Sequence, residues 1–265
     1  MGLSHVQNRG PHPLAGYRIP HPNRPAIVQG AKHQTLLARA AGFVLLWILV
    51  GIMGLVADRT IPRQHLPWKR LTLLDPVGAA TRTKAARAGA DPAACHAILK
   101  AGGVEFRETP VQSSGFCAIE DSLQVIAGLA PLKPADAPMT CKQALAVVIW
   151  ERQVVQTAAF AELDQAVVGI DHYGSYSCRR IYGQAEGPVS EHALANALDV
   201  AGFRLADGTT ISVLKDWKDP GPKGRFLRQV RDGACKVFLT TLSPDYNAQH
   251  ANHLHLDMGG WPKCA

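Results

Sequence analysis

One run of apolar residues stands out in the hydrophobic pattern of the chain. It extends from Ala40 to Ala57 and contains no charged side chain. Arg39 precedes this run and Asp58 follows it. About 18 apolar residues are just enough to cross the hydrocarbon core of a bilayer, and a helix that is apolar all round has no face for water. We therefore predict a transmembrane signal anchor over residues 37–58 that contacts the membrane through residues 40–57. A cleaved signal peptide is the alternative.

The segments on either side of this run have no regular hydrophobic period. Residues 1–36 are rich in Pro, His, Arg and Gly, which predicts a disordered cytoplasmic tail. Residues 59–90 are basic and contain prolines, which predicts a linker between the membrane and a folded domain.

Periodic patterns begin near Asp91, so residues 91–265 are the predicted domain. Asp91-Pro92 is typical of a helix start, and Thr140 with Gln143 predicts a capping box. Helices come first and strands follow with one helix between them, which predicts an α+β fold with a small antiparallel sheet and packed helices. The expected helices cover 92–101, 140–163 and 225–238, and the expected strands cover 104–108, 166–177, 197–205, 210–214 and 253–257.

The charge of the chain limits its partners. The 265 residues carry a formal net charge of +7 with an apolar fraction of 47%, which permits a core and suits contact with an anionic surface such as a cell wall. The sequence has no basic stripe with interleaved aromatic residues, so we expect no nucleic-acid partner.

All six cysteines follow the apolar run, and none forms a CxxC pair. This spacing argues against a thiolate zinc cage. Scattered cysteines in an exported domain indicate disulfides in an oxidising compartment, while buried free thiols in a cytosolic protein are the alternative. The sequence does not choose among the pairings. A disulfide between Cys178 and Cys235 is one candidate pairing.

Two patches hold candidate chemistry: Ser190 to Asp199, and the run HLHLD from His253 to Asp257. Residues two apart on a strand share a face, so His253 and His255 can reach into one cleft. Two imidazoles and a carboxylate are a suitable zinc set with one position left open. His192, Asp199 and His255 can supply it, which leaves His253 for proton transfer. Either patch alone is also compatible with surface hydrogen bonding.

The first patch resembles the SxHxxGxAxD motif of the group that includes lysostaphin, the D-Ala-D-Ala metallopeptidases and the hedgehog signalling domain. Ser190, His192, Ala197 and Asp199 fall on its fixed positions, and Ala195 stands where those relatives have Gly. HLHLD resembles the HxH of the same group. The resemblance implies a hedgehog/D-Ala-D-Ala-peptidase-like domain that binds Zn²⁺ through His192, Asp199 and His255, with His253 as a catalytic residue.

A second resemblance covers most of residues 91–265 and is to the bacterial extensin-like C-terminal domain family. Its label says nothing about mechanism. The residues that carry it are Tyr176-Ser177-Cys178-Arg179, SEHALANALDVAGF from Ser190, Asp216-Trp217, Phe226-Leu227-Arg228, Cys235 and HLHLD.

Further candidates surround the predicted zinc site. The resemblance to D-Ala-D-Ala enzymes makes Arg179 a catalytic candidate that binds substrate and steadies an oxyanion, although Arg180 is an alternative. Asp257 is a candidate to orient a zinc-bound imidazole, and Ser190 is a candidate to support His192. Three other histidines are interpreted as structural or surface residues: His96, His172 and His250.

Together these patterns predict a zinc-dependent peptidase that hydrolyses amide bonds in stem or cross-link peptides of peptidoglycan. Endopeptidase and carboxypeptidase activities both remain open. The expected location is the inner membrane, with a single span and the C-terminal domain in the periplasm. The alternative function is an inactive cell-wall-binding module that keeps a structural zinc, since fold alone does not determine activity.

Overall fold

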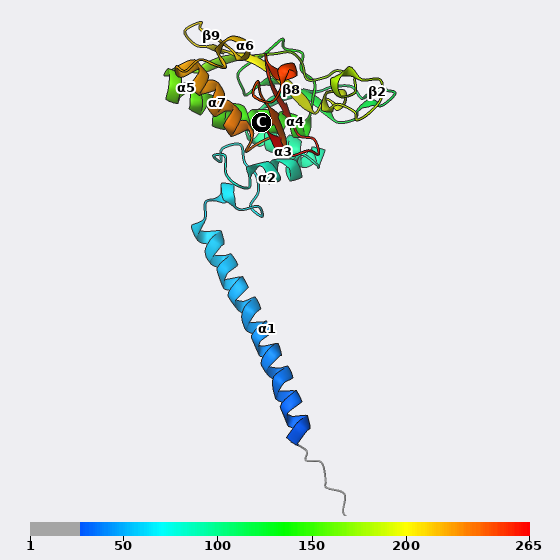
Figure 1. Ribbon diagram of the computed structural model, residues 1–265, viewed down its shortest axis with the longest axis vertical. Helices are drawn as coiled ribbons and strands as arrows, with labels where there is room; N and C mark the ends of the chain where they lie inside the picture. The colour runs from blue at the N-terminus through cyan, green and yellow to red at the C-terminus, as the bar shows by residue number, and fades with distance from the viewer. Residues whose placement is uncertain (1–26) are drawn as a thin grey trace, which may run out of the picture. The chain divides into compact units, whose positions relative to one another are not determined.

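The computed structural model describes residues 27–265 of the protein, with side chains from Thr35 onward. The chain divides into a unit that ends at Ala57 and a compact unit from Asp58 to Ala265. The compact unit combines helices with strands and small, mainly antiparallel sheets (Figure 1), so the predicted α+β class is confirmed.

Helix α1 (Ile27–Thr60) contains the predicted apolar run. Its stretch Thr35–Thr60, 26 residues, is long and apolar enough to cross a membrane. Large apolar side chains along it are exposed, including Leu45, Trp47 and Ile52, which is the pattern of a helix with apolar surroundings. The helix begins earlier than expected, so residues 27–36 are helical and the predicted tail is wrong for them. Residues 1–26 of that tail lie outside the described part of the chain.

The predicted linker, residues 59–90, is part of the compact unit instead. It forms a short 3-10 turn, η1 (Arg63–His65), and helix α2 (Thr81–Ala88), which packs on α4. Leu66 and Leu73 are 3% and 2% exposed, and Leu73 joins the main core. The apolar residues of the predicted linker are widely spaced among basic residues and prolines, so local composition does not reveal that they fill the core.

One long helix, made of three consecutive segments, occupies the centre of the compact unit. α4 (Cys141–Trp150) continues through a π-helical turn, η2 (Glu151–Val155), into α5 (Gln156–Leu163). Every residue from Gln143 to Trp150 is at most 1% exposed. The Trp150 ring lies 6.0 Å from that of Phe203 and 6.1 Å from that of Phe238. This single helix confirms the element predicted over 140–163.

The start of this helix is tied to the strands that carry the candidate site. Thr140 Oγ1 accepts from Gln143 N (3.2 Å), as the capping-box pattern predicts. The side-chain amide of Gln143 does not bond to the backbone amide of Thr140, as a complete capping box requires. It donates to Leu256 O (2.9 Å), and Thr140 N donates to Ala195 O (2.8 Å). The helix N-terminus therefore holds the backbone on both sides of the site.

Within residues 27–265, seven strands form the main sheet, in the order β12-β10-β11-β8-β7-β5 with β9 paired to β8. Its neighbours are antiparallel except for β5 with β7 and β10 with β12. Its strands are β5 (Leu132–Lys133), β7 (Val167–His172), β8 (Ala197–Leu205), β9 (Thr210–Ser212), β10 (Thr240–Leu242), β11 (Leu254–Asp257) and β12 (Lys263–Cys264). The smaller sheets are β1-β4-β6 and β2-β3, from β1 (Glu105–Glu108), β2 (Gln112–Ser114), β3 (Cys117–Ile119), β4 (Ser122–Ala127) and β6 (Met139–Thr140).

Most predicted elements are present, with shifted ends. α3 (Pro92–Ala101) begins where Asp91 accepts from the amides of Ala93 and Ala94. The strand expected over 166–177 ends at His172, and the one over 210–214 turns into helix α6 (Val213–Asp216). The last long helix is α7 (Pro222–Ala234), which begins earlier than predicted and lies beside α5 (Figure 1). Strands between residues 112 and 140 were not predicted, because they are short and lack a clear period.

Three disulfides pair all six cysteines: Cys95–Cys141, Cys117–Cys178 and Cys235–Cys264. Disulfides are therefore confirmed, but the pairing of Cys178 with Cys235 is wrong. Each cysteine meets a partner 29 to 61 residues away along the chain, so the pairing depends on long-range contacts between elements.

The Cys95–Cys141 bond gives a test of stability that leaves the candidate site untouched. It joins α3 to α4, and both residues are fully buried. We expect the double variant Cys95→Ala, Cys141→Ala to lose about 2–4 kcal/mol of unfolding free energy, because the bond restricts the unfolded chain. Denaturant unfolding of the chain in detergent measures this loss. An unchanged midpoint would contradict it.

Candidate metal centre

Strand pairing brings two of the three predicted ligands together. β8 and β11 are antiparallel neighbours, and Asp199 lies opposite His255. Residues that are directly opposite share a face of the sheet. Their neighbours Leu198 and Leu254 point to the other face and are fully buried. The alternation of Leu with polar residues therefore directs the carboxylate and the imidazole to the same side.

The third predicted ligand comes from a short turn before β8. His192 lies in η4 (Glu191–Leu194), a 3-10 turn capped by Ser190, whose hydroxyl accepts from His192 N (3.3 Å). Ser190 thus holds the backbone of His192. The side chain of His192 is only 4% exposed.

Three side-chain atoms converge in a small triangle. Asp199 Oδ1 lies 3.1 Å from His192 Nε2 and 2.9 Å from His255 Nδ1, and the two nitrogens are 3.2 Å apart. Among the described residues, this group meets the distance pattern of a possible metal site. It consists of the three residues that the sequence pointed to.

In each imidazole, the contact of the nitrogen that faces away from Asp199 determines which nitrogen carries the proton. His192 Nδ1 is 3.2 Å from the carbonyl oxygen of Ser175, which only accepts, so this nitrogen donates. His255 Nε2 is 2.8 Å from Asp257 Oδ2 and donates to it, while Asp257 Oδ1 accepts from Gly259 N. With the far nitrogens protonated, neutral rings direct a lone pair toward Asp199. Three acceptors that face one another need a cation between them, either a metal ion or a proton.

The same contacts set the ionisation of the cluster. Burial opposes charge on His255, but hydrogen bonds and the charges of Asp199 and Asp257 outweigh it and raise the pKa of His255 to about 9. Burial also opposes charge on Asp199, and its hydrogen bonds to His192 and His255 lower the pKa of that carboxyl well below its usual range. The site is thus arranged to hold a carboxylate together with positive charge.

The donor set fits a zinc ion. Zinc binds imidazole nitrogen and carboxylate oxygen at about 2.0–2.2 Å, and tetrahedral geometry then separates the ligand atoms by about 3.3–3.5 Å. The observed separations of 2.9 to 3.2 Å are slightly shorter, so small shifts accommodate the ion. Asp257 and the Ser175 carbonyl hold the far nitrogens, which is the usual support of zinc-binding histidines.

His253 lies beside the triangle rather than in it. Its Nδ1 is 2.8 Å from Asn252 Oδ1, and its Nε2 is 3.5 Å from Asp199 Oδ1. Burial lowers the pKa of His253 and the charge of Asp199 partly opposes this shift. The exposed ring of Tyr173 stands edge-on to His253, with centroids 6.0 Å apart. His253 is thus held in place by Asn252 with one nitrogen directed at the cluster.

A cavity of about 920 Å³ contains the cluster. It is bounded by the cluster side chains and by residues of three other segments: Arg179, Ile181, Tyr182, Gly183, Pro188, Val189, Ser190 and Glu191; Thr240, Leu242, Tyr246, Gln249 and His250; Gly260, Trp261 and Lys263. A volume in this range is that of a ligand-binding cleft.

The choice between the two neighbouring arginines is decided by their contacts. Arg180 lies over the ring of Phe116, 4.6 Å from its centroid, and donates to Gly187 O. Arg179 lines the cavity, and its backbone carbonyl accepts from Ser190 N (3.2 Å). Cys178, the residue before it, is bonded to Cys117. Arg179 is therefore the arginine that the cleft presents to a bound molecule.

The family model of the extensin-like protein C-terminus matches residues 93–265. The chain belongs to this family. No curated protein and no solved structure matches the chain. The matched residues include all of the cluster, so the candidate metal centre lies inside the extensin-like domain.

The extensin-like domain departs from the SxHxxGxAxD motif at Ala195, and the structure gives the consequence. Ala195 has φ 51° and ψ 31°, a left-handed conformation that glycine adopts freely. Its amide donates to His192 O (3.2 Å), and its carbonyl accepts from Thr140 N (2.8 Å). The turn is thus held at a strain of about 1–2 kcal/mol that glycine would not carry.

Sequence reasoning missed several residues of the cleft in the extensin-like domain. His250 is buried, its ring centroid is 5.2 Å from that of His253, and it is hydrogen-bonded to Asn247 Oδ1 (2.6 Å). Burial first, and then its histidine neighbours, lower the pKa of His250 to about 4. His250, interpreted from the sequence as a structural or surface residue, is thus a buried residue that lines the cleft beside His253. Its position three residues before the first histidine of the HxH was the available signal.

Proposed function

We propose that the extensin-like domain is a zinc-dependent peptidase, with a hedgehog/D-Ala-D-Ala-peptidase-like site, that hydrolyses amide bonds in peptidoglycan stem or cross-link peptides. The observation that carries the proposal is the convergence of His192 Nε2, Asp199 Oδ1 and His255 Nδ1 in a cleft that also contains His253. The resemblance of both patches to the lysostaphin and D-Ala-D-Ala group supports it.

In this proposal each residue has a separate task. His192, Asp199 and His255 hold the zinc, and Asp257 and Ser175 hold the two imidazoles in the required tautomers. Bound zinc supplies Lewis-acid chemistry, by acidifying water and polarising an amide carbonyl. His253, through Nε2, would stabilise or protonate the tetrahedral species that forms when water adds to the amide carbonyl. Arg179 binds the negative charge that develops on the substrate oxygen.

The location is part of the proposal. Helix α1 is apolar and long enough to span a membrane, and three disulfides favour an oxidising compartment. Both features support an inner-membrane protein with a single span whose C-terminal domain lies in the periplasm. The net charge of +7 complements the anionic groups of peptidoglycan.

The direct test is digestion of purified peptidoglycan by the full chain in detergent, with the products identified by mass spectrometry. We expect new muropeptides, their loss on treatment with a chelator, and their return when zinc is added. Cleavage of cross-linked dimers identifies an endopeptidase, and loss of a terminal residue identifies a carboxypeptidase. A chain that holds one zinc yet yields no products would instead favour the wall-binding module.

A further inference from the structure

Strand register places one lysine on the same face of the sheet as the metal ligands. Lys263 on β12 lies opposite Thr240 on β10, which lies opposite Asp257 on β11. Asp257 and His255 are two apart on one strand, so they share a face. Lys263, Thr240, Asp257 and His255 therefore point to the same side, in agreement with their places around the cavity.

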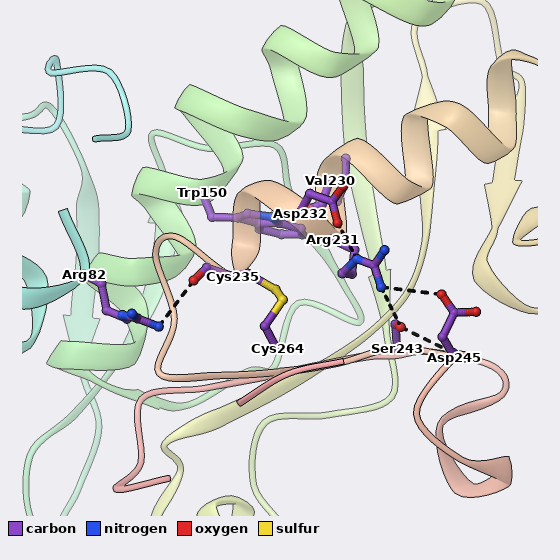
Figure 2. Close-up of a disulfide and its surroundings, with 9 residues drawn as sticks. All are labelled: Arg82, Trp150, Val230, Arg231, Asp232, Cys235, Ser243, Asp245 and Cys264. Atoms are coloured by element: carbon purple, nitrogen blue, oxygen red, sulfur yellow. Dashed lines mark hydrogen bonds and ion pairs between the residues drawn. A yellow bond between two sulfur atoms is a disulfide. The ribbon is translucent and has the colours of Figure 1, made fainter. Parts of the chain in front are cut away.

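The C-terminal strand is firmly attached to the sheet. Lys263 N donates to Leu239 O and Ala265 N to Thr241 O, both at 3.0 Å. The next residue, Cys264, is bonded to Cys235 just after α7 (Figure 2). The backbone carbonyl of Cys235 also accepts from Arg82 (3.4 Å). The position of Lys263 at the cleft is therefore built into the fold.

The cleft contains cations without anionic partners. Among residues 27–265, neither Lys263 nor Arg179 forms an ion pair; Lys263 Nζ lies 4.6 Å from the ring centroid of Tyr246. The nearby carboxylates are engaged elsewhere. Asp199 and Asp257 contact the histidines, and Glu191 accepts from Asn196 Nδ2 (2.6 Å). A substrate with its own carboxylate would complement these charges.

We propose that Lys263 binds a free carboxylate of the substrate peptide and makes the cleft selective for acidic peptides. Lys263 is on β12 and His255 is on β11, with β10 between them. The spacing of two strands places the subsite about 10 Å from His255 across the sheet. An extended peptide covers this distance in about three residues. Lys263 thus recognises a carboxylate a few residues away from the amide bond that reacts, whereas Arg179 acts near that bond. The assignment rests on the proposed function for the identity of the peptide.

The test compares two synthetic stem-type peptides that differ only in whether one carboxyl group is free or amidated. Binding is measured by calorimetry on the full, zinc-loaded chain in detergent, with His253→Ala present throughout to prevent turnover. We expect Lys263→Ala to weaken binding of the acidic peptide about three- to tenfold and to leave the amidated peptide unaffected. Lys263→Arg keeps the charge and should retain most of the preference.

Lys236 provides a matched control, because it is exposed, follows the other cysteine of the same disulfide and lies outside the cavity lining. Lys236→Ala is expected to bind both peptides normally. Equal loss in Lys236→Ala, or a preference that survives Lys263→Ala, would overturn the assignment. Hydrolysis of the same two peptides is measured separately on chains that keep His253. If Lys263 gives the preference for the acidic peptide but no peptide is hydrolysed, the peptidase is refuted and this subsite stands. If the peptides are hydrolysed but neither binding nor turnover depends on Lys263, the subsite is refuted and the peptidase stands.

Discussion

Replacement of His192 by alanine is expected to remove most of the bound zinc and all measurable peptidase activity. His192 supplies one of three converging donor atoms and is the most buried of them, with a side chain 4% exposed. Without it, Asp199 and His255 remain as two ligands, which is fewer than a catalytic zinc site uses. Loss of a supporting partner alone costs about 10–100-fold in metal affinity, so loss of a direct ligand should cost more than about 100-fold.

Zinc content after dialysis, measured by mass spectrometry of the metal, checks this expectation. His96→Ala is the matched control, because His96 contacts Phe106 and Glu108, away from the cleft. The control should retain its zinc and its activity. If His192→Ala kept one zinc per chain, the ligand assignment would be wrong for both the peptidase and the wall-binding module.

Replacement of His253 by alanine is expected to reduce kcat about 10²- to 10⁴-fold while zinc content stays the same. His253 Nε2 faces the cluster at 3.5 Å from Asp199, yet the other three residues form the triangle without it. A residue that moves a proton affects the reaction, whereas a ligand affects the metal. The two variants, His192→Ala and His253→Ala, should therefore separate metal binding from proton transfer.

Single-turnover kinetics on a defined cross-linked peptide, with zinc measured on the same sample, gives both quantities. Asn252→Ala extends the series, because it removes the partner of His253 Nδ1 but leaves Nε2 in place. We expect its kcat to lie between those of the wild type and His253→Ala. Loss of zinc from His253→Ala would contradict the division of roles and would make His253 a ligand.

The candidate site could be read largely from sequence, since its chemistry is concentrated in two short patches. His192 and Asp199 lie seven residues apart, and strand alternation alone places His255 and Asp257 on one face. The helix start at Thr140 was also predictable, because a cap depends on residues three apart. The sequence did not predict features that lack a local period, such as the burial of Leu66 and Leu73 in the predicted linker.

The sequence by itself determined the apolar helix, the α+β class and the donor set, because each depends on composition or on the spacing of neighbours along the chain. Only the tertiary structure decided which cysteines pair, that Arg179 rather than Arg180 faces the cleft, and that Lys263 joins the ligands on one face of the sheet. These features depend on contacts between segments far apart in sequence, and the register of β8, β10, β11 and β12 determines the last of them.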